Sequence, residues 1–86
     1  MMTVTVSKHR APIEVKSFAE ASREVSRYIS GNGFGASEWY AELPFTKKAK
    51  GAAIHENGVQ TAFVSYNGRV WRGVEDFKMG HEEIAV

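Results

Sequence analysis

Two Asn-Gly dipeptides, at positions 57–58 and 67–68, constrain the fold of this 86-residue chain more than any other feature. Asn-Gly favours the centre of a two-residue type I′ turn, in which both residues take a positive φ. Each dipeptide separates runs of apolar and β-branched residues, and therefore predicts a β-hairpin. Together they predict an antiparallel meander with strands near 52–56, 59–66 and 69–74.

Two-residue turns would also fix which side chains share a face, because side chains alternate along a strand. Across the first turn, Ile54 is predicted to pair with Thr61. Across the second turn, Val64 is predicted to pair with Trp71. One predicted face is mostly aliphatic and suits a covering helix: Ile54, Val59, Thr61, Phe63, Val70 and Val74. The opposite predicted face is amphipathic and aromatic: Ala53, His55, Gln60, Ala62, Val64, Tyr66, Arg69 and Trp71.

The N-terminal segment predicts a further hairpin. Residues 3–7 and 13–16 alternate between apolar and polar side chains, which is typical of half-buried strands. The polar segment between them ends at Pro12 and predicts the turn.

A helix is predicted to follow this hairpin. Ser17 and Glu20 form an S-x-x-E capping box, in which the Ser17 hydroxyl accepts from the Glu20 amide and the Glu20 carboxylate reaches back to the Ser17 amide. The glycine-containing segment 30–33 predicts the helix end, because glycine readily adopts the left-handed conformation that closes a helix. The apolar residues between these points share one stripe at helical spacing: Phe18, Ala21, Val25, Tyr28 and Ile29.

Two segments are less regular. Residues 38–43 carry an apolar side chain at every second position, which predicts a strand ending at Pro44. A helical turn capped by Ser37 is the competing interpretation. Residues 75–86 are mostly polar and predict a short turn or a loosely packed tail.

These elements predict one α+β domain over residues 1–86. A single helix would pack on an antiparallel sheet, with N-terminal strands, then the helix, then the C-terminal three-stranded meander. The chain is shorter than the length at which chains divide into domains. Its 43% hydrophobic and 24% charged residues are typical of globular proteins.

Several classes of function are disfavoured by composition. The chain has no cysteine, which excludes disulfides, thiolate metal sites and a cysteine nucleophile. His9, His55 and His81 lie in different predicted elements, without the spacing of a zinc site. The serines occupy caps, the helix or strands, and none stands on a strained turn beside a base. We therefore expect no catalytic site, no metal and no cofactor.

The same composition bears on location. No apolar run approaches the roughly 20 residues that span a bilayer. The N-terminus lacks the basic and apolar regions of a signal peptide. We expect a cytoplasmic protein of bacterial or phage type that makes no membrane contact.

Three runs of sequence carry a resemblance: Phe18-Ala19-Glu20-Ala21-Ser22, Gly35-Ala36-Ser37-Glu38-Trp39-Tyr40 and Ser65-Tyr66-Asn67-Gly68-Arg69-Val70-Trp71. Across most of residues 13–72, the chain resembles short uncharacterised α+β proteins of bacterial genomes and mobile elements. The resemblance implies a capped helix and an Asn-Gly hairpin. It implies no activity, so no functional residue is carried over from it.

The aromatic face of the meander is the surface that we expect to function. Trp, Tyr and Arg dominate interface hot spots, which predicts contact with a protein partner or with a second copy of the chain. The predicted contact residues are Trp71, Tyr66, Arg69, Val64 and His55. A basic loop would steer an acidic partner, through Lys47, Lys48 and Lys50. The first hypothesis is a non-enzymatic binding module, such as an inhibitor or accessory protein of a mobile element.

Three alternatives stay open. Trp39, Phe34 or the C-terminal tail could cover the aromatic face as a second small core, because large aromatic residues are usually buried. The same face and the basic loop could instead bind single-stranded nucleic acid by stacking. A formal net charge of +1 supplies no global field for that purpose. The third alternative is a structural homodimer.

Overall fold

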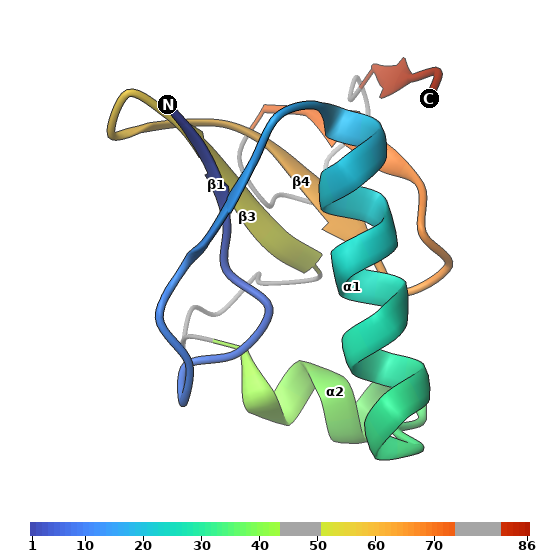
Figure 1. Cartoon of the computed structure of the whole chain (residues 1–86). Coiled ribbons are helices and arrows are strands. Elements are labelled where there is room, and N and C mark those ends of the chain that lie inside the picture. The colour runs from blue at the N-terminus through green and yellow to red at the C-terminus, as the bar shows by residue number, and fades with distance from the viewer. Residues whose placement is uncertain (44–50, 74–81) are drawn as a thin grey trace.

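The computed structural model describes residues 1–43, 51–73 and 82–86. Two helices pack with a six-stranded antiparallel sheet, whose strand order is β2-β1-β3-β4-β5-β6. In Figure 1 the long helix α1 covers one side of the sheet, and α2 lies across the lower end beside the end of α1. The α+β class and the order of strands, helix and C-terminal strands are confirmed, whereas the prediction of a single helix is wrong.

The N-terminal hairpin forms as predicted. β1 (Met2–Val4) and β2 (Ile13–Val15) pair antiparallel, with Thr3 opposite Glu14. β1 pairs on its other side with β3 (Gly51–Glu56). The N-terminal strands and the meander therefore form one sheet.

α1 (Phe18–Asn32) begins at the predicted cap. The Ser17 hydroxyl accepts from the Glu20 amide at 3.1 Å. The Glu20 carboxylate, however, accepts from the Lys16 amide at 2.7 Å, and the predicted bond to the Ser17 amide is wrong by one residue. The carboxylate still satisfies a backbone donor beside the helix start.

The apolar stripe of α1 faces the sheet, as predicted. Ala21, Val25 and Ile29 are buried, and Phe18 and Tyr28 pack at the edge of the core. The helix ends at Gly33, whose φ of 67° is the left-handed conformation that glycine adopts at little cost. Phe34 then folds back, with its ring centroid 5.8 Å from that of Tyr28.

A second helix, α2 (Ala36–Glu42), replaces the strand predicted at 38–43. Its start is stabilised by Glu38, whose carboxylate accepts from the Gly35 amide at 2.7 Å. Trp39 and Leu43 are both buried and lie four positions apart, which fits one face of a helix as well as alternate positions of a strand. The alternative prediction of a helical turn in this segment is correct, although the N-cap residue is Gly35 and not Ser37.

The meander contains β3, β4 (Val59–Ser65) and β5 (Val70–Arg72). A short sixth strand, β6 (Glu83–Ile84), pairs with β5 within the segment predicted to be a tail. Residues 75–81 of that segment lie outside the described residues.

The first Asn-Gly pair makes the predicted tight turn. Asn57 and Gly58 have φ values of 54° and 86°, as a type I′ turn requires. Glu56 pairs with Val59, and His55 pairs with Gln60. The register then shifts, because Ile54 pairs with Ala62 and not with the predicted Thr61. Thr61 is the extra residue of a β-bulge, and its hydroxyl donates to the Glu56 carboxylate.

The second Asn-Gly pair belongs to a wider, three-residue loop, and the predicted register across it is wrong by one position. The Ser65 amide donates to the Arg69 carbonyl at 2.8 Å. Among the described residues, Asn57 is the only one other than glycine with a positive φ. Asn67 therefore has a negative φ and does not adopt a type I′ geometry. The Asn67 side-chain oxygen instead accepts from the Arg69 amide at 3.2 Å and from the Ser65 hydroxyl. These bonds favour a turn followed by a left-handed Gly68, a common three-residue hairpin.

The bulge and the longer loop each reverse which side chains face the helices, so the second cancels the effect of the first. The bulge at Thr61 reverses the side-chain alternation along β4, so Val64 enters the core and Phe63 lies on the far side, contrary to prediction. The odd-length loop reverses the alternation again. Val70 and Trp71 on β5 therefore keep their predicted faces, and Val64 pairs with Val70 in place of Trp71.

The main core lies between the helices and the near face of the sheet. Its buried members are Val4, Val6, Val15, Ala21, Val25, Ile29, Trp39, Leu43, Ala52, Ile54, Ala62, Val64 and Val70. Trp39 is fully buried, and its indole Nε1 donates to the Val6 carbonyl at 3.0 Å. The alternative in which Trp39 covers the far face of the sheet is therefore wrong.

Candidate functional site

Trp71 lies on the side of the sheet away from the helices, as predicted. It pairs with Phe63 across β4 and β5, and neither residue belongs to the core packed beneath the helices. The Trp71 side chain is half-buried, and its Nε1 donates to the Ser65 hydroxyl oxygen at 3.1 Å. The hydrogen bond fixes the orientation of the indole.

His55 lies on the same side of the sheet as Trp71. It follows the buried Ile54 on β3, so its side chain points away from the core. Thr3 stands opposite it on β1, and both side chains are half-buried. Arg69, two positions before Trp71, also lies on this side, because its guanidinium lies beside Glu83, which pairs with Trp71. The structure thus keeps the predicted side for three of the five contact residues.

Val64 and Tyr66 do not join Trp71. Val64 is fully buried in the core. Tyr66 turns toward the helices, where its hydroxyl donates to the Phe34 carbonyl at 3.1 Å and its ring centroid lies 6.2 Å from that of Trp39. The predicted five-residue surface is therefore divided between the two sides of the sheet.

The basic residues near this surface have acidic neighbours. Arg69 is exposed, and its guanidinium lies 3.8 Å from the Glu83 carboxylate. Arg72 lies 3.6 Å from the Glu82 carboxylate. The predicted basic loop of Lys47, Lys48 and Lys50 lies outside the described residues.

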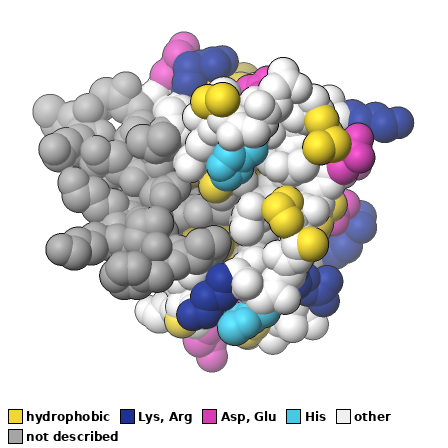
Figure 2. All heavy atoms as spheres, turned by 90° about the vertical axis from the view of Figure 1, so that its left-hand side faces the viewer, with side chains coloured by type: hydrophobic (Ala, Val, Ile, Leu, Met, Phe, Trp, Pro, Cys, Tyr) yellow, Lys and Arg dark blue, Asp and Glu magenta, His cyan; other side chains and the backbone are white. Residues whose placement is uncertain are grey.

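The sheet side of the molecule has a mixed surface in its described part. Figure 2 shows hydrophobic side chains there as small separate groups among polar and backbone atoms. The described part of this face therefore carries no broad apolar patch.

A hydrogen-bond network of Ser7, Tyr28 and Glu42 lies near the C-terminal end of α1. The Glu42 carboxylate oxygen Oε1 accepts from the Tyr28 hydroxyl at 2.9 Å and from the buried Ser7 hydroxyl at 3.0 Å. These hydrogen bonds, that of Tyr28 first, lower the pKa of Glu42 from its ordinary value, and the charges of His9 and Lys8 act in the same direction. The network ties α1, α2 and the loop after β1 together.

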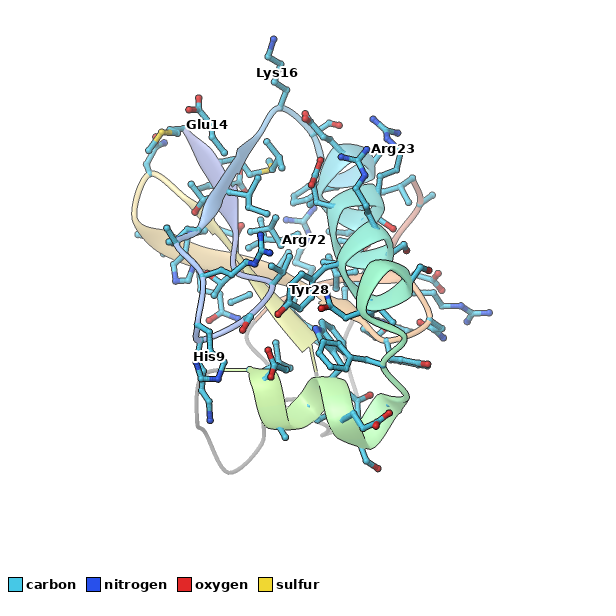
Figure 3. All side chains as sticks on the ribbon, turned by 60° about the horizontal axis from the view of Figure 1, so that its bottom comes forward. His9, Glu14, Lys16, Arg23, Tyr28 and Arg72 are labelled. Atoms are coloured by element: carbon cyan, nitrogen blue, oxygen red, sulfur yellow. The ribbon has the colours of Figure 1, made fainter. Side chains whose placement is uncertain are left out.

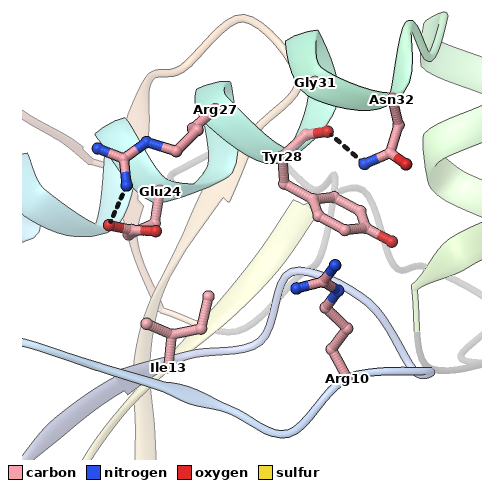
Figure 4. A pocket seen from close by; sticks show the side chains of 7 residues that line it. All are labelled: Arg10, Ile13, Glu24, Arg27, Tyr28, Gly31 and Asn32. Carbon is pink, nitrogen blue, oxygen red and sulfur yellow. Dashed lines mark hydrogen bonds and ion pairs between the residues drawn. The ribbon is translucent and has the colours of Figure 1, made fainter.

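Tyr28 also borders an open groove between α1 and the β1–β2 loop. The groove has a volume of about 340 Å³ and is lined by Arg10, Ile13, Glu24, Arg27, Tyr28, Gly31 and Asn32. The Arg10 guanidinium carbon lies 5.3 Å from the Tyr28 ring centroid, a cation–π distance. In Figure 3 Tyr28 points from α1 toward the interior of the molecule, whereas Lys16 projects away from it. Figure 4 shows Arg10 reaching from the loop toward Tyr28.

The sequence predicted neither the groove nor the network. The sequence predicts Arg10 in a polar turn and Tyr28 in the apolar stripe of the helix. Both predictions are correct, but neither indicates that the two side chains meet. No periodicity links a loop residue to a helix residue, so no local pattern could have brought the two together. Tyr28 at the edge of the apolar stripe was the one signal in the sequence for the network, because a partly buried tyrosine hydroxyl needs a hydrogen-bond partner.

Comparisons with known proteins add no functional residue. No family model matches the chain, and neither the curated proteins nor the solved structures that were searched contain a significant match. Within residues 1–43, 51–73 and 82–86, no group of three or more His, Asp or Glu side chains could hold a metal ion. Neither helix of this described part is long and apolar enough to cross a membrane.

Proposed function

We propose that this protein is a small non-enzymatic module that binds a protein partner through the side of the sheet around Trp71. The observation that carries the proposal is the half-buried indole, which points away from the helices and is held by Ser65. A side chain held in one orientation loses little conformational entropy on binding. Tryptophan is also among the residues most enriched in interface hot spots. An inhibitor or accessory protein of a mobile element is one form that such a module would take.

The surroundings of Trp71 support an interface with a polar rim. His55 and Thr3 lie on the same side of the sheet, and both are half-buried. Protein interfaces commonly combine a few buried aromatic anchors with a polar, partly solvated rim. Trp71 would serve as the anchor, and His55 would contribute hydrogen bonds at the rim.

The charges favour a protein partner over single-stranded nucleic acid. Arg69 and Arg72 each lie within 4 Å of a glutamate, so their charge is partly compensated. The formal net charge of the whole chain is +1. Nucleic-acid binding without sequence preference depends on several uncompensated cations that release counterions.

Affinity capture with matched variants tests the proposal. Immobilised wild-type protein, Trp71→Ala and Val59→Ala are exposed to the same host extract and to one purified candidate partner from it. Val59 is 64% exposed and serves as a control for the general loss of apolar surface. We expect Trp71→Ala to lose the partner and Val59→Ala to retain it, with circular dichroism confirming that both variants fold.

Two further measurements separate the alternatives. Binding of a single-stranded oligonucleotide that weakens steeply with salt, and that is lost in Lys47→Glu combined with Lys48→Glu, would replace the proposal with nucleic-acid binding. Light scattering that gives a dimer sensitive to Trp71→Ala would make a second copy of the chain the partner. Retention of a purified partner by Trp71→Ala at wild-type affinity would refute the role of this surface.

A further inference from the structure

We propose that the groove between α1 and the β1–β2 loop binds a carboxylate of an acidic peptide segment, with Arg10 as the recognising cation. The inference deepens the proposed function by naming the chemistry of a partner, and it rests on that function because the peptide belongs to a protein partner. The groove lies at residues distinct from Trp71, so the two sites can be tested separately.

Arg10 is an exposed arginine whose guanidinium lies over the Tyr28 ring and has no acidic partner among the described residues. Its guanidinium carbon stands 5.3 Å from the Tyr28 ring centroid, and its backbone amide donates to the Ser7 carbonyl at 3.2 Å. Among the described residues, the ion pairs shorter than 4.0 Å involve Arg27, Arg69 and Arg72 and do not include Arg10. A guanidinium offers two parallel N–H donors, which match the two oxygens of a carboxylate.

The aromatic wall of the groove is held in place before any ligand binds. The Tyr28 hydroxyl donates to Glu42 at 2.9 Å, and the same Glu42 oxygen accepts from the fully buried Ser7. Ile13 adds a half-buried aliphatic surface on the strand side. These two side chains can contact the methylene groups of a glutamate whose carboxylate meets Arg10, at little cost in reorganisation.

The remaining charges of the groove favour a ligand group that carries a single negative charge. Arg27 lies 3.4 Å from Glu24, so these two charges largely offset each other. One uncompensated cation, Arg10, then remains in the lining. A carboxylate balances that single charge, whereas a phosphate group with a charge near −1.5 to −2 would also be repelled by Glu24. A peptide carboxylate is therefore the better match.

The groove also has free space and a further donor. A side-chain atom added at Gly31 would meet nothing within 4 Å, so this part of the lining is open. Asn32 uses one hydrogen of its side-chain amide to donate to the Tyr28 carbonyl at 2.8 Å. An amide nitrogen carries two hydrogens, and the second can donate to a peptide oxygen.

Titration with a model peptide, followed by two-dimensional NMR of the whole chain, tests the inference. The probe is a capped tetraglutamate peptide, and the control probe is capped tetraglutamine. We expect tetraglutamate to shift the signals of Arg10, Tyr28, Gly31 and Asn32, and tetraglutamine to leave them unchanged. Because a charge-assisted hydrogen bond is lost, Arg10→Gln should weaken binding about tenfold or more.

Matched variants separate the groove from general charge effects. Lys16→Gln also removes one exposed positive charge, but Lys16 projects away from the groove and this variant should bind as the wild type does (Figure 3). Gly31→Leu should block the groove, whereas Gly31→Ala adds a single methyl group to open space and should leave binding intact. Both changes replace glycine by a better helix former, so the fold should be retained.

Three outcomes would overturn the inference. The first is the absence of shifts at the groove with tetraglutamate. The second is equal weakening by Arg10→Gln and Lys16→Gln, which would indicate general charge attraction. The third is tighter binding of inorganic phosphate than of tetraglutamate at the same residues, which would make the groove a phosphate site. The Trp71→Ala capture experiment tests a different surface from the groove. A negative result in one experiment therefore does not change the conclusion drawn from the other.

Discussion

The two tryptophans of this chain should respond very differently to the same substitution. Trp39 is fully buried and donates to the Val6 carbonyl at 3.0 Å, whereas Trp71 is half-buried and donates to a serine hydroxyl. Trp39→Phe and Trp71→Phe each remove an indole nitrogen and part of a ring. The surroundings alone therefore decide the loss of stability.

The expected magnitudes follow from these surroundings. Trp39→Phe leaves the carbonyl of the buried Val6 without this donor, which costs about 1–3 kcal/mol. The lost burial of roughly two carbon atoms adds about 1.5 kcal/mol. The total, about 3 kcal/mol, should lower Tm by at least about 12 °C for a domain of this size. Trp71→Phe should cost about 1 kcal/mol or less, because water can replace the donor at the partly accessible Ser65.

Thermal unfolding followed by circular dichroism, supported by urea unfolding, measures both losses. Equal losses of stability in the two variants would refute the placement of Trp39 in the core and of Trp71 at the surface. A larger loss for Trp71→Phe would show that the far side of the sheet holds the principal core.

Three other perturbations follow from the structure. Gly51→Ala should lower the free energy of unfolding in urea by about 1–3 kcal/mol or more, because its Cβ would lie 2.3 Å from the Val64 carbonyl oxygen; unchanged stability would contradict this close approach. Ser17→Ala should cost about 1 kcal/mol in the same assay, through loss of the helix cap, and Ser17→Asp should retain most of the wild-type stability. The lowered pKa of Glu42 contributes stability that is present above the ordinary value of 4.5 and is lost as pH falls through the lower folded value. Glu42→Gln should therefore lose less stability than the wild type on acidification, and an equally steep acid limb in both proteins would count against the network.

The elements with strong local signals were predictable from the sequence. The Ser17–Glu20 box located the helix start, and the glycines near 33 located its end, because both act within a few residues. The Asn57–Gly58 turn also formed as its dipeptide predicts. The α+β class followed from these elements together.

The errors arose where a short pattern was ambiguous or where distant contacts decided the outcome. Residues 38–43 fit both a strand and a helix, and the burial of Trp39 against Val6 favours the helix through a contact that spans much of the chain. The bulge at Thr61 has no signature in the sequence. At the second turn, side-chain hydrogen bonds of Asn67 and the bond from Ser22 to the Gly68 carbonyl, at 2.7 Å, hold the loop against α1.

These errors determine what the sequence could say about the site. Trp71 was placed on the correct side, but only because the bulge and the longer loop cancel each other on β5. Val64 lies between the two irregularities, and Tyr66 is the first residue of the longer loop, so both were predicted on the wrong side of the sheet. The groove at Arg10 and Tyr28 depends wholly on tertiary packing and had no signal of its own.

Solvent exchange of the two indole N–H groups, measured by NMR with and without a partner obtained by capture, tests the central claim most directly. The Trp39 N–H, buried against Val6, should exchange slowly in both states. The Trp71 N–H should exchange quickly in the free protein and slow down when the partner binds. A complex in which the Trp71 N–H exchanges as quickly as in the free protein would contradict the proposal that this indole anchors the partner.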